Sequence, residues 1–526
     1  MRFERPWLTH FLRPRGGAIP PDAPLVAASL MRKEEFTIHS PMNVLLIRPD
    51  PGNERFGLGP FFRVEPLGLE YVASALRARG HTPTIIDLRF GHNVRAWARR
   101  TRPNLVGISC MHALEYDRVI ETARQIRRVV PDAFILVGGH AAAAFPGPLE
   151  APEIDAVCVD DGEEVVPAVA DALADGRPLS LMDVPALRLK TSDGWISTRP
   201  LEDRTGLDEI PLPARDLVER DRNRYHCLLF KPVWLIETAR GCPFRCSFCS
   251  VWQLYGRSFR ERSVGAVVDD FERTGESLFI ADDLFWNHPE RSRELARALK
   301  AKGVRKRWIL VQTRTDLVCR SADLLEEWRP IAKDFDIFFG LEAASDAGLA
   351  SVTKDTGVGA SIEAARISRE LGYGVTGNFL VDPDWDEAQF EELWDFVATQ
   401  GFQRAGYTIL TPLPGTELFQ KLAPILEGQP WFKYDMHHVL WEPRLGAKRF
   451  FELYAETWRR SILNTSGEKS WIEWMRQVKP VQIPYLTRVL MRTQRMMKAQ
   501  AYMKEHEEAQ RIAPLRSAPP QALVAS

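Results

Sequence analysis

Three cysteines crowd into one short segment of this sequence. The run ETARGCPFRCSFCSVW places Cys242, Cys246 and Cys249 in a C-x3-C-x2-C arrangement, with no fourth cysteine nearby. Cysteine thiolates are the usual ligands of iron–sulfur clusters, and a short loop lets one segment wrap one cluster. The spacing therefore predicts a 4Fe-4S cluster held by three thiolates. Its fourth iron would stay open to a small molecule that offers an amine and a carboxylate.

A zinc site and a chance grouping in a buried strand are the alternatives for these cysteines. Structural zinc normally takes four protein ligands arranged in pairs, and no second pair of cysteines or histidines lies within reach in the sequence. The Gly-Cys-Pro run, with Arg245 and Ser247 between the cysteines, favours a loop over a core strand. We therefore prefer the cluster.

The composition is that of a globular chain with several domains. The 526 residues are 45% apolar and 26% charged with a formal net charge of -1, which excludes a disordered or fibrous protein and does not point to nucleic acid. The remaining cysteines are scattered, so a secreted disulfide framework is not expected. The N-terminus lacks the apolar stretch of a signal peptide, and no run is long enough to span a bilayer, which favours the cytoplasm.

The elements that must position the cysteine loop fall into two alternating series. After an extension over residues 1–41, strand-like runs alternate with amphipathic helices over 42–175, beginning with MNVLLIRP, LGLEYVASALRARG and TPTIIDL. This alternation predicts a doubly wound, Rossmann-like parallel sheet, which binds ligands at the carboxyl ends of its strands. Prolines interrupt the pattern over 176–229, which we interpret as a linker with a small hairpin.

The second alternating series covers residues 230–425. Six strand-like runs, from VWLIETARG to AGYTILT, are separated by helical stretches such as ERSRELARALKAKG. This series predicts a partial (β/α)6 TIM barrel, which carries its chemistry on the loops after its strands. The three cysteines lie on the loop after the first strand. Residues 426–526 are rich in tryptophan and helical in pattern, so we expect a helical C-terminal region with a polar tail.

At the cysteine loop the chain resembles the radical S-adenosylmethionine (SAM) superfamily, whose hallmark C-x3-C-x-aromatic-C is matched by Cys242, Cys246, Phe248 and Cys249. The resemblance implies that the open iron binds the methionine portion of SAM, and that an electron from the cluster cleaves SAM to a 5'-deoxyadenosyl radical. Where the family has a glycine-rich strand end for the methionine amine, this chain has Ala-Asp-Asp at 281–283. Side chains at strand ends that could contact SAM, or equally be barrel-layer or surface residues, are Asp282, Gln312, Arg314 and Glu342.

The first sheet carries small and acidic residues at the ends of its predicted strands, namely Ser109, Gly138, Gly139, Asp161, Gly162 and Glu163. Glycines there would let a flat, bulky ligand approach the backbone. No G-x-G-x-x-G follows the first strand, so a dinucleotide fingerprint is missing. The order and spacing of PLGLEYVASALRARGH, VGISC, VGGH and DDGEE resemble the cobalamin-binding domain of cobalamin-dependent radical SAM enzymes of the class B methylase type. This resemblance implies cobalamin bound by the domain at 42–175, with these six residues as contacts.

The loop after the first strand lacks the histidine that many cobalamin domains offer to cobalt in an Asp-x-His-x-x-Gly motif, because it reads DPGNER at 50–55. The resemblance therefore implies cobalt without a protein imidazole below it, and labile methyl transfer. His92 and His112 could compensate, although a lone histidine after a strand is more often a packed or surface residue. Arg63, in GPFFRVEPLG, is a further candidate neighbour of the corrin ring.

The C-terminal region has two features that bear on the substrate. An aromatic group could line a large apolar pocket or simply seal the barrel by packing, and consists of Trp431, Tyr434, His437, His438 and Trp441. The run PYLTRVLMRTQRMMKAQAYMKEHEEAQ mixes apolar and basic side chains. Such a helix can lie on an anionic membrane surface, but more often packs on its own domain.

A cobalamin domain ahead of a radical-generating barrel implies a methyltransferase that acts on an unactivated carbon. The runs FFRVEPLGLEYVASALRARGH and GNFLVDPDWDEAQFEELWDFV, leading into TILTPLPGT, resemble hopanoid C-2 methylases and so imply a triterpenoid lipid substrate. The alternatives are a tetrapyrrole cyclase or peripheral tetrapyrrole methylase with the same cofactors, and a non-catalytic corrinoid or cluster sensor. The expected partners are an electron donor such as flavodoxin or ferredoxin and, through the basic helix, the inner face of the membrane.

Overall fold

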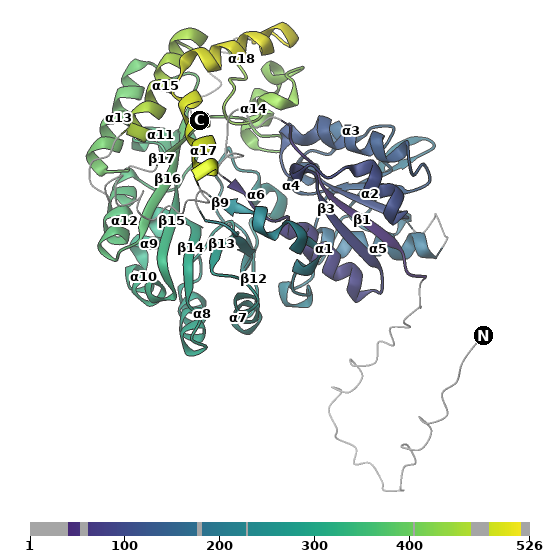
Figure 1. Ribbon diagram of the computed structural model, residues 1–526. Coiled ribbons are helices and arrows are strands. Elements are labelled where there is room, and N and C mark those ends of the chain that lie inside the picture. Colours follow the sequence, from purple (N-terminus) through teal and green to yellow (C-terminus); the bar gives the residue numbers. More distant parts are fainter. Residues whose placement is uncertain are drawn as a thin grey trace, which may run out of the picture. The chain divides into compact units, whose positions relative to one another are not determined.

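The computed structural model describes residues 40–52, 62–175, 181–227, 230–402, 405–463 and 483–516. Two sheets organise this part of the chain, one of seven strands and one of six (Figure 1). Helices follow most of the strands in both sheets. This arrangement confirms the predicted α/β class, with a Rossmann-like sheet first and a partial barrel second.

The first sheet has the strand order β3-β1-β4-β5-β6-β7-β8. Its five parallel strands are, in that order, β3 (Thr82–Asp87), β1 (Asn43–Arg48), β4 (Leu105–Ser109), β5 (Phe134–Gly138) and β6 (Ala156–Cys158). The hairpin of β7 (Leu187–Thr191) and β8 (Gly194–Ser197) continues the sheet with antiparallel pairing. The sheet therefore runs past residue 175, into the segment that we interpreted as a linker.

Helices cover both faces of the first sheet because alternate residues of its buried strands are apolar on both sides. In β1, Val44 and Leu46 face one side while Leu45 and Ile47 face the other. The first face is covered by α1 (Leu67–Ala78) and α5 (Gly162–Ala174), and the second by α2 (Val94–Thr101) and α3 (Tyr116–Arg127). Burying each of these aliphatic side chains contributes about 1.5–3 kcal/mol.

The second sheet is a partial barrel of six parallel strands. In spatial order they are β10 (Trp234–Ile236), β13 (Ser277–Ile280), β14 (Lys306–Thr313), β15 (Ala332–Glu342), β16 (Gly374–Val381) and β17 (Ala405–Ile409). In β14, Ile309 and Val311 face the outer helices, whereas Trp308 and Leu310 face the interior. Trp308 stacks on Phe230, with ring centroids 4.1 Å apart, and closes the barrel near the start of its strands.

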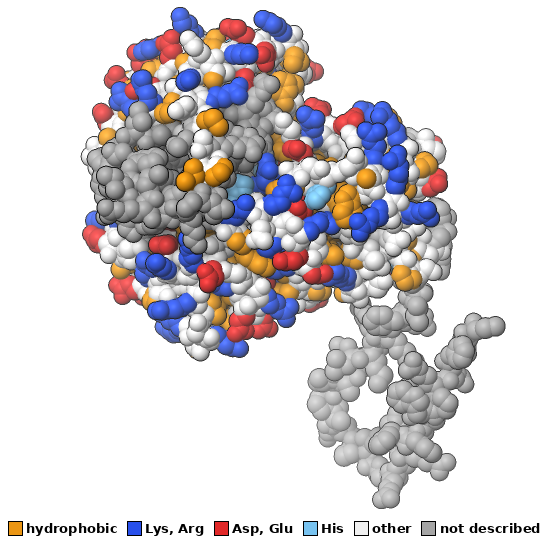
Figure 2. Space-filling view, in the orientation of Figure 1, with side chains coloured by type: hydrophobic (Ala, Val, Ile, Leu, Met, Phe, Trp, Pro, Cys, Tyr) orange, Lys and Arg blue, Asp and Glu red, His pale blue; other side chains and the backbone are white. Residues whose placement is uncertain are grey.

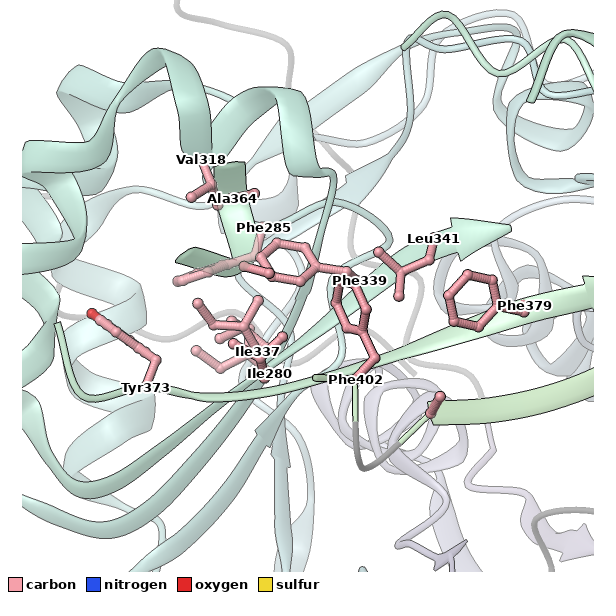
Figure 3. Packing of buried hydrophobic residues seen from close by; sticks show 14 of the residues in the cluster. Ile280, Phe285, Val318, Ile337, Phe339, Leu341, Ala364, Tyr373, Phe379 and Phe402 are labelled. Atoms are coloured by element: carbon pink, nitrogen blue, oxygen red, sulfur yellow. The ribbon is translucent and has the colours of Figure 1, made fainter. Parts of the chain in front are cut away.

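The outer face of the barrel strands holds a large apolar core. Figure 3 shows part of it, where Ile280 of β13 and Ile337 and Phe339 of β15 lie with Val318 and Ala364 from the surrounding helices. These helices are α7 (Val264–Glu272), α8 (Pro289–Ala301), α9 (Thr315–Arg320), α10 (Ala322–Trp328), α12 (Val358–Glu370) and α13 (Glu387–Gln400). The core fixes the strands, and with them the loops at their carboxyl ends.

The C-terminal helices divide between the two sheets. α14 (Glu417–Leu426) buries Leu418 and Leu422 in the core of the first sheet. α15 (Ala447–Leu463) packs on α18 (Ala499–Ile512), where Phe451 stacks on Tyr502 with ring centroids 5.5 Å apart. α17 (Ile483–Met496) lies between them in sequence, but the side chains of Leu486, Arg488, Val489, Leu490 and Arg492 are outside the described residues.

Within the described ranges, no helix is both long and apolar enough to cross a bilayer. Acidic and basic side chains are interspersed over the face drawn in Figure 2, in keeping with the net charge of -1.

Buried charges join the first sheet to the barrel. Glu65, just before α1, accepts hydrogen bonds from the backbone N of Leu235 in β10 at 2.5 Å and from Arg215 at 2.8 Å. Arg215 also donates to both carboxylate oxygens of Asp270 in α7, at 3.0 Å. Arg222 is a second ion-pair partner of Glu65. All four charged side chains are buried, so this joint is sensitive to the loss of any one of them.

Candidate functional site

A cavity of about 700 Å³ lies between the carboxyl ends of the first sheet and the mouth of the barrel. The sheet contributes residues that follow β1, β4, β5 and β6, and the barrel contributes residues that follow β10, β13 and β17. The carboxyl ends of parallel strands are where both fold types place their ligands. One chamber is therefore shared by the two halves of the chain.

All seven residues that we predicted to contact cobalamin line this cavity: Arg63, Ser109, Gly138, Gly139, Asp161, Gly162 and Glu163. Gly139 has a φ of 106°, and a Cβ there would meet the carbonyl oxygen of Cys110 at 2.8 Å. Only glycine suits that position, which keeps the backbone open to a ligand over β5.

The cavity continues as a slot between the first sheet and the two helices on one of its faces. Its walls are Leu46, Gly107, Leu136 and Cys158 from the sheet, Val72 from α1 and Val166 from α5. A Cβ on Gly107 would meet the Cδ2 of Leu46 at 2.7 Å, so glycine at this position makes room for the Leu46 side chain. A ligand with a flat body and a side arm could lie over the strand ends and insert the arm into this slot.

The cysteine loop is held by backbone contacts on several sides. It follows the short strand β11 (Ala239–Gly241), which pairs with β12 (Phe259–Glu261), and leads into α6 (Val251–Tyr255). Ser247 donates its backbone N–H to Val352 at 3.1 Å and accepts from the N–H of Leu418 at 3.1 Å. The indole of Trp252 donates to the carbonyl of Cys246 at 2.9 Å. Phe248, the aromatic residue of the motif, packs against the core of the first sheet.

The three thiols of this loop are free and lie within electrostatic reach of one another. Burial raises the pKa of all three, to about 12 for Cys249, and negative charge on Cys242 and Cys246 raises the pKa of Cys249 further. Within the described ranges, no three His, Cys, Asp or Glu side chains gather closely enough for one metal ion. Cysteine thiolates are the usual ligands of iron–sulfur clusters, which spread them over several irons.

Charged residues from later barrel strands surround Cys246. Burial raises the pKa of the Cys246 thiol, while the charges of Lys354 and Arg314 oppose that effect. Arg314 lies over the ring of Phe244, 3.7 Å from its centroid, and so contacts the loop directly. Glu342, at a bulge of β15 with a φ of 62°, accepts a hydrogen bond from Lys354 at 2.8 Å. Two of the predicted SAM residues, Arg314 and Glu342, are thus brought beside the cysteines.

Gln312 and Asp282 are placed differently from these two. Gln312 is a half-buried residue of β14, and its carbonyl accepts from the backbone N–H of Phe285. Asp282 is buried away from the cavity and accepts from the backbone N and the Oγ1 of Thr238, both at 2.6 Å. Its neighbour Asp283 lines the cavity instead and accepts from the N–H of Gly241 at 2.9 Å. Burial raises the pKa of Asp282 to about 7 and that of Asp283 to about 6.

A buried ion-pair network connects the cobalamin side of the cavity with the cysteine loop. Arg240, two residues before Cys242, donates to Asp161 at 3.2 Å, Glu163 at 3.0 Å and Glu237 at 2.7 Å. Arg260 of β12 adds a bond to Asp161 at 2.5 Å. Burial would raise the pKa of Asp161, but Arg240 and Arg260 outweigh it and lower that pKa. The carboxylates of Asp161 and Glu163 are therefore paired with arginines at the cavity wall.

The aromatic group of the C-terminal region splits between the cavity and the protein core. Tyr434 and His437 line the cavity. Trp431 packs edge-on against Tyr116, with centroids 4.9 Å apart, and Trp441 donates its indole N–H to Asp384 at 3.0 Å. His438 pairs with Asp435 at 3.0 Å, which agrees with the packing interpretation. Both interpretations from the sequence thus apply, to different residues.

Several residues of the cavity wall were not among the sequence candidates: Glu237, Arg240, Ser250, Leu254, Tyr255 and His140. Arg240 stands directly before Gly-Cys in TARGC, so its place at a strand end was a usable signal. The hydrogen bond between His140 and Ser250 joins residues 110 apart in sequence, which no local pattern reveals.

Two family models match the chain in the places that the fold suggests. The B12 binding domain matches residues 60–170, and the Radical SAM superfamily matches residues 236–397. The first match covers the parallel strands of the first sheet after β1, and the second covers the cysteine loop and most of the barrel.

Several known proteins and solved structures are similar to this chain. Hopanoid C-3 methylase from Methylococcus capsulatus is 32% identical over 420 residues, which is 78% of each chain. Anaerobic magnesium-protoporphyrin IX monomethyl ester cyclase from Rubrivivax gelatinosus is 27% identical over 444 residues, 80% of this chain and 78% of the relative. The cobalamin-dependent SAM radical enzyme OxsB with aqua-cobalamin bound has a TM-score of 0.64 at 16% identity, over 92% of this chain and 83% of OxsB. The methyltransferase TsrM from Kitasatospora setae, with cobalamin and a 4Fe-4S cluster bound, has a TM-score of 0.59 at 18% identity, over 74% and 79%.

A B12-binding sheet followed by a barrel with a three-cysteine loop defines a radical SAM enzyme that uses cobalamin. The structural likenesses support that fold, and the relatives support the chemistry. The chain belongs to the family of cobalamin-dependent radical SAM methylases. It is a C-methyltransferase whose cofactors are a 4Fe-4S cluster, SAM and cobalamin, which confirms the predicted enzyme class over a non-catalytic sensor.

Proposed function

We propose that this enzyme transfers a methyl group to an unactivated ring carbon of a hopanoid triterpenoid. The observation that carries the proposal is the 32% identity to a hopanoid methylase across 78% of both chains. The relative is named for C-3, whereas our prediction from the sequence is C-2, and these are neighbouring carbons of one ring. The position is therefore part of the test below.

The cavity wall is consistent with a polycyclic hydrocarbon. Apolar residues that face the chamber from the barrel side include Leu235, Leu254, Leu413, Pro414 and Met436. Apolar surface removed from water contributes about 25 cal/mol per Å², so a large hydrocarbon skeleton gains most of its binding energy this way. A dry chamber also protects reactive species from water.

For the cluster and SAM, we propose that Cys242, Cys246 and Cys249 hold three irons beside Phe248. Arg314 and Glu342, with Lys354, are close enough to orient the charged ends of SAM, and Gln312 lies on the strand that leads to Arg314. We assign the cavity-facing role near the methionine amine to Asp283, because Asp282 is bonded to Thr238 instead. Asp282 then acts by positioning the strand end. When bound, cluster and SAM supply a radical that removes hydrogen from carbon, and cobalamin supplies the methyl group.

For cobalamin, we propose that the corrin ring lies over the strand ends at Ser109, Gly138, Gly139 and Gly162, near Arg63. The slot beside Gly107 would take the nucleotide tail, because it is the side arm of the same chamber. Asp161 and Glu163 contribute through their ion pairs with Arg240, which hold the chamber wall. The domain limits that we expect, 42–175 for cobalamin and 230–425 for SAM, remain predictions.

A tetrapyrrole reaction is the second candidate function. It is favoured by the cyclase relative, whose match spans 80% of this chain at 27% identity. The cofactors would be the same and only the chamber's occupant would differ. A peripheral tetrapyrrole methylase belongs to the same alternative, since methyltransferases of bacteriochlorophyllide d also match the chain over shorter spans.

The experiment is anaerobic reconstitution with iron, sulfide, cobalamin, a reductant and SAM that carries an isotope-labelled methyl group. A hopene and magnesium-protoporphyrin IX monomethyl ester are offered in separate reactions, and products are analysed by mass. We expect the hopene to gain one labelled methyl group, with its position given by fragmentation and NMR. An unchanged hopene and a converted tetrapyrrole would overturn the hopanoid proposal. The Cys249→Ala variant is the matched control, and should give no product.

Two partners follow from this proposal. A reductant is needed because radical SAM chemistry begins with an electron, and we propose a flavodoxin or ferredoxin as its source. Membrane contact through the basic run at 484–510 would give access to a lipid. In α18 of that run, Tyr502, Glu505 and His506 are buried against the enzyme's own domain, so any contact has to use the remaining faces.

A further inference from the structure

A short helix of the first sheet, α4 (His140–Ala144), contacts the cysteine loop across the shared cavity. It follows the glycine turn at 138–139, within the part of the chain that matches the B12 binding domain. His140 and Ser250, the residue after Cys249, both line the cavity. The Nε2 of His140 lies 2.6 Å from the Oγ of Ser250. One hydrogen bond therefore joins the cobalamin-binding domain directly to the cysteine loop.

The hydroxyl of Ser250 is not used by its own helix. Ser250 occupies the N-cap position of α6, where a serine hydroxyl commonly accepts a hydrogen bond from the first turn of the helix that follows. No such capping bond is made here. Because Ser250 is buried, its hydroxyl needs another partner, and His140 supplies it from 110 residues away in sequence. The side chain of Ser250 is thus held by the first domain.

The turn that carries His140 is fixed to the carboxyl edge of the first sheet. The backbone N–H of Cys110, after β4, donates to the carbonyl of Gly138 at 2.7 Å. The carbonyl of Cys110 accepts in return from the N–H of Ala141 in α4 at 3.1 Å. Between them Gly139, with its φ of 106°, approaches the Cys110 backbone too closely for a Cβ. A ligand that contacts this turn therefore also restricts His140.

The last residue of α4 contacts a second support of the cysteine loop. A Cβ on Gly415, shortly before α14, would meet the carbonyl oxygen of Ala144 at 2.8 Å, so the two backbones are in close contact. In α14, the backbone N–H of Leu418 donates to the carbonyl of Ser247 at 3.1 Å. Ser247 precedes Cys249 and Ser250 follows it. The helix after the glycine turn is therefore linked to the cysteine loop on both sides of its last cysteine.

We propose that the hydrogen bond between His140 and Ser250 couples the two cofactor sites, so that bound cobalamin strengthens the binding of SAM at the cluster. The proposal rests on the cofactor placement given under the proposed function. Cobalamin on the turn after β5 restricts His140, and with it Ser250 and the cysteine loop. The first ligand then supplies the free energy of ordering this segment, so the second ligand binds more tightly. The effect is reciprocal, because SAM must strengthen cobalamin binding by the same factor. His140 and Ser250 are positioning residues that act through the cysteine loop.

The test compares the affinity for SAM with and without cobalamin. Full-length protein is reconstituted anaerobically with iron and sulfide, and equilibrium dialysis against radiolabelled SAM is done with and without hydroxocobalamin. No reductant or substrate is added, so no methyl group is transferred, and bound iron and cobalamin are measured in each sample. We expect cobalamin to lower the dissociation constant of SAM about 5-fold, which one neutral hydrogen bond can account for. Equal dissociation constants would overturn the proposal.

Four variants assign the coupling to this bond. Ser250→Ala and His140→Ala should each bring the two dissociation constants within about 2-fold of each other, and the double variant should do no more than either one. Ser250→Thr keeps a hydroxyl and should keep the full effect.

Ser258→Ala is the matched control, because the hydroxyl of Ser258 lies in the same segment but donates to the carbonyl of Tyr255 at 2.6 Å. It should also keep the full effect. If Ser250→Ala raised both dissociation constants equally, their ratio would be unchanged and the bond would have only a structural role, which would refute the coupling. An unchanged ratio would also result if the ion pairs of Arg240 carried the coupling. Because the measurement needs no substrate, an enzyme that methylates no hopene can still show the coupling, and the reverse also holds.

Discussion

The ion pairs of Arg240 offer a quantitative test of how the two halves of the enzyme are joined. Arg240→Met keeps much of the volume of the side chain but removes its charge and three hydrogen-bonded carboxylate contacts. Asp161 keeps Arg260, at 2.5 Å. Within the described ranges, no other cation lies within salt-bridge distance of Glu163 or Glu237. Two carboxylates therefore lose their cation.

The expected loss of stability in Arg240→Met follows from the burial of the carboxylates that lose their partner. Removing one partner of a buried ion pair costs about 3–5 kcal/mol, because the remaining charge is left unpaired in the interior. Glu163 has a side chain only 7% exposed, whereas that of Glu237 is 17% exposed and can gain some hydration. We therefore expect Arg240→Met to lower the free energy of unfolding by about 3 kcal/mol.

Anaerobic urea unfolding of the protein without cofactors, followed by tryptophan fluorescence, measures this difference. Arg366→Met is the matched control, because Arg366 also binds two carboxylates, Glu363 and Glu370, but on an exposed helix surface. It should leave the unfolding midpoint unchanged. The double variant Arg240→Met/Glu163→Leu should recover part of the loss, because it removes one unpaired charge. A loss below about 1 kcal/mol in Arg240→Met, as for a surface pair, would refute the reasoning.

Three further predictions concern single positions around the site. Gly241 has a φ of 98°, and a backbone carbonyl lies where a new Cβ would be, so Gly241→Ala should reduce the iron bound after reconstitution. Gly256 has a φ of 60° and open space around it, so Gly256→Ala should lower the free energy of unfolding by only about 1 kcal/mol and bind iron normally. Gly139→Ala should weaken cobalamin retention on gel filtration, because its Cβ would meet the carbonyl of Cys110 at 2.8 Å; retention equal to wild type would mean that this turn can shift. Asp282 has a folded pKa of about 7 against about 3.9 unfolded, so its stabilising effect is complete below pH 4 and is lost as the pH rises to 7. In urea titrations, Asp282→Asn should therefore lessen the fall in stability between pH 4 and 8, by up to about 4 kcal/mol, and an unchanged pH profile would contradict the raised pKa.

The parallel strands were predictable because burial on both faces leaves a direct mark in the sequence. Runs such as NVLLIR at 43–48 and FILVG at 134–138 are apolar at successive positions, as strands with helices on both sides must be. The hairpin at 187–197 was not assigned to the sheet, because β7 has only alternate residues buried and β8 has only half-buried or exposed residues, so neither strand shows a continuous apolar run. Its pairing with β6 depends on side-chain contacts that the local pattern does not specify.

The parts of the candidate site that depend on backbone conformation were predictable from the sequence. The parts that depend on which of two successive side chains faces the cavity were less predictable. The glycines at 138, 139 and 162 were found because a close approach to a ligand requires them. Asp282 was selected from the sequence, yet it bonds to Thr238 after the end of β13, whereas its neighbour Asp283 bonds to Gly241 and faces the cavity. The contacts of Arg240 bridge up to 79 residues of sequence, so they become visible only when the two halves are brought together.

The buried charges around Glu65 also limit how family members can be recombined. Glu65 lies just before α1, Arg215 and Arg222 lie in the connecting segment, and Asp270 lies in α7 of the barrel. A chimaera that takes its barrel from a relative without an acidic residue at the place of Asp270 would remove one of the carboxylates that pair with Arg215, and Glu65, the nearest one that remains, is shared with Arg222. We therefore expect that the barrel can be exchanged without loss of stability only together with the segment that carries the two arginines.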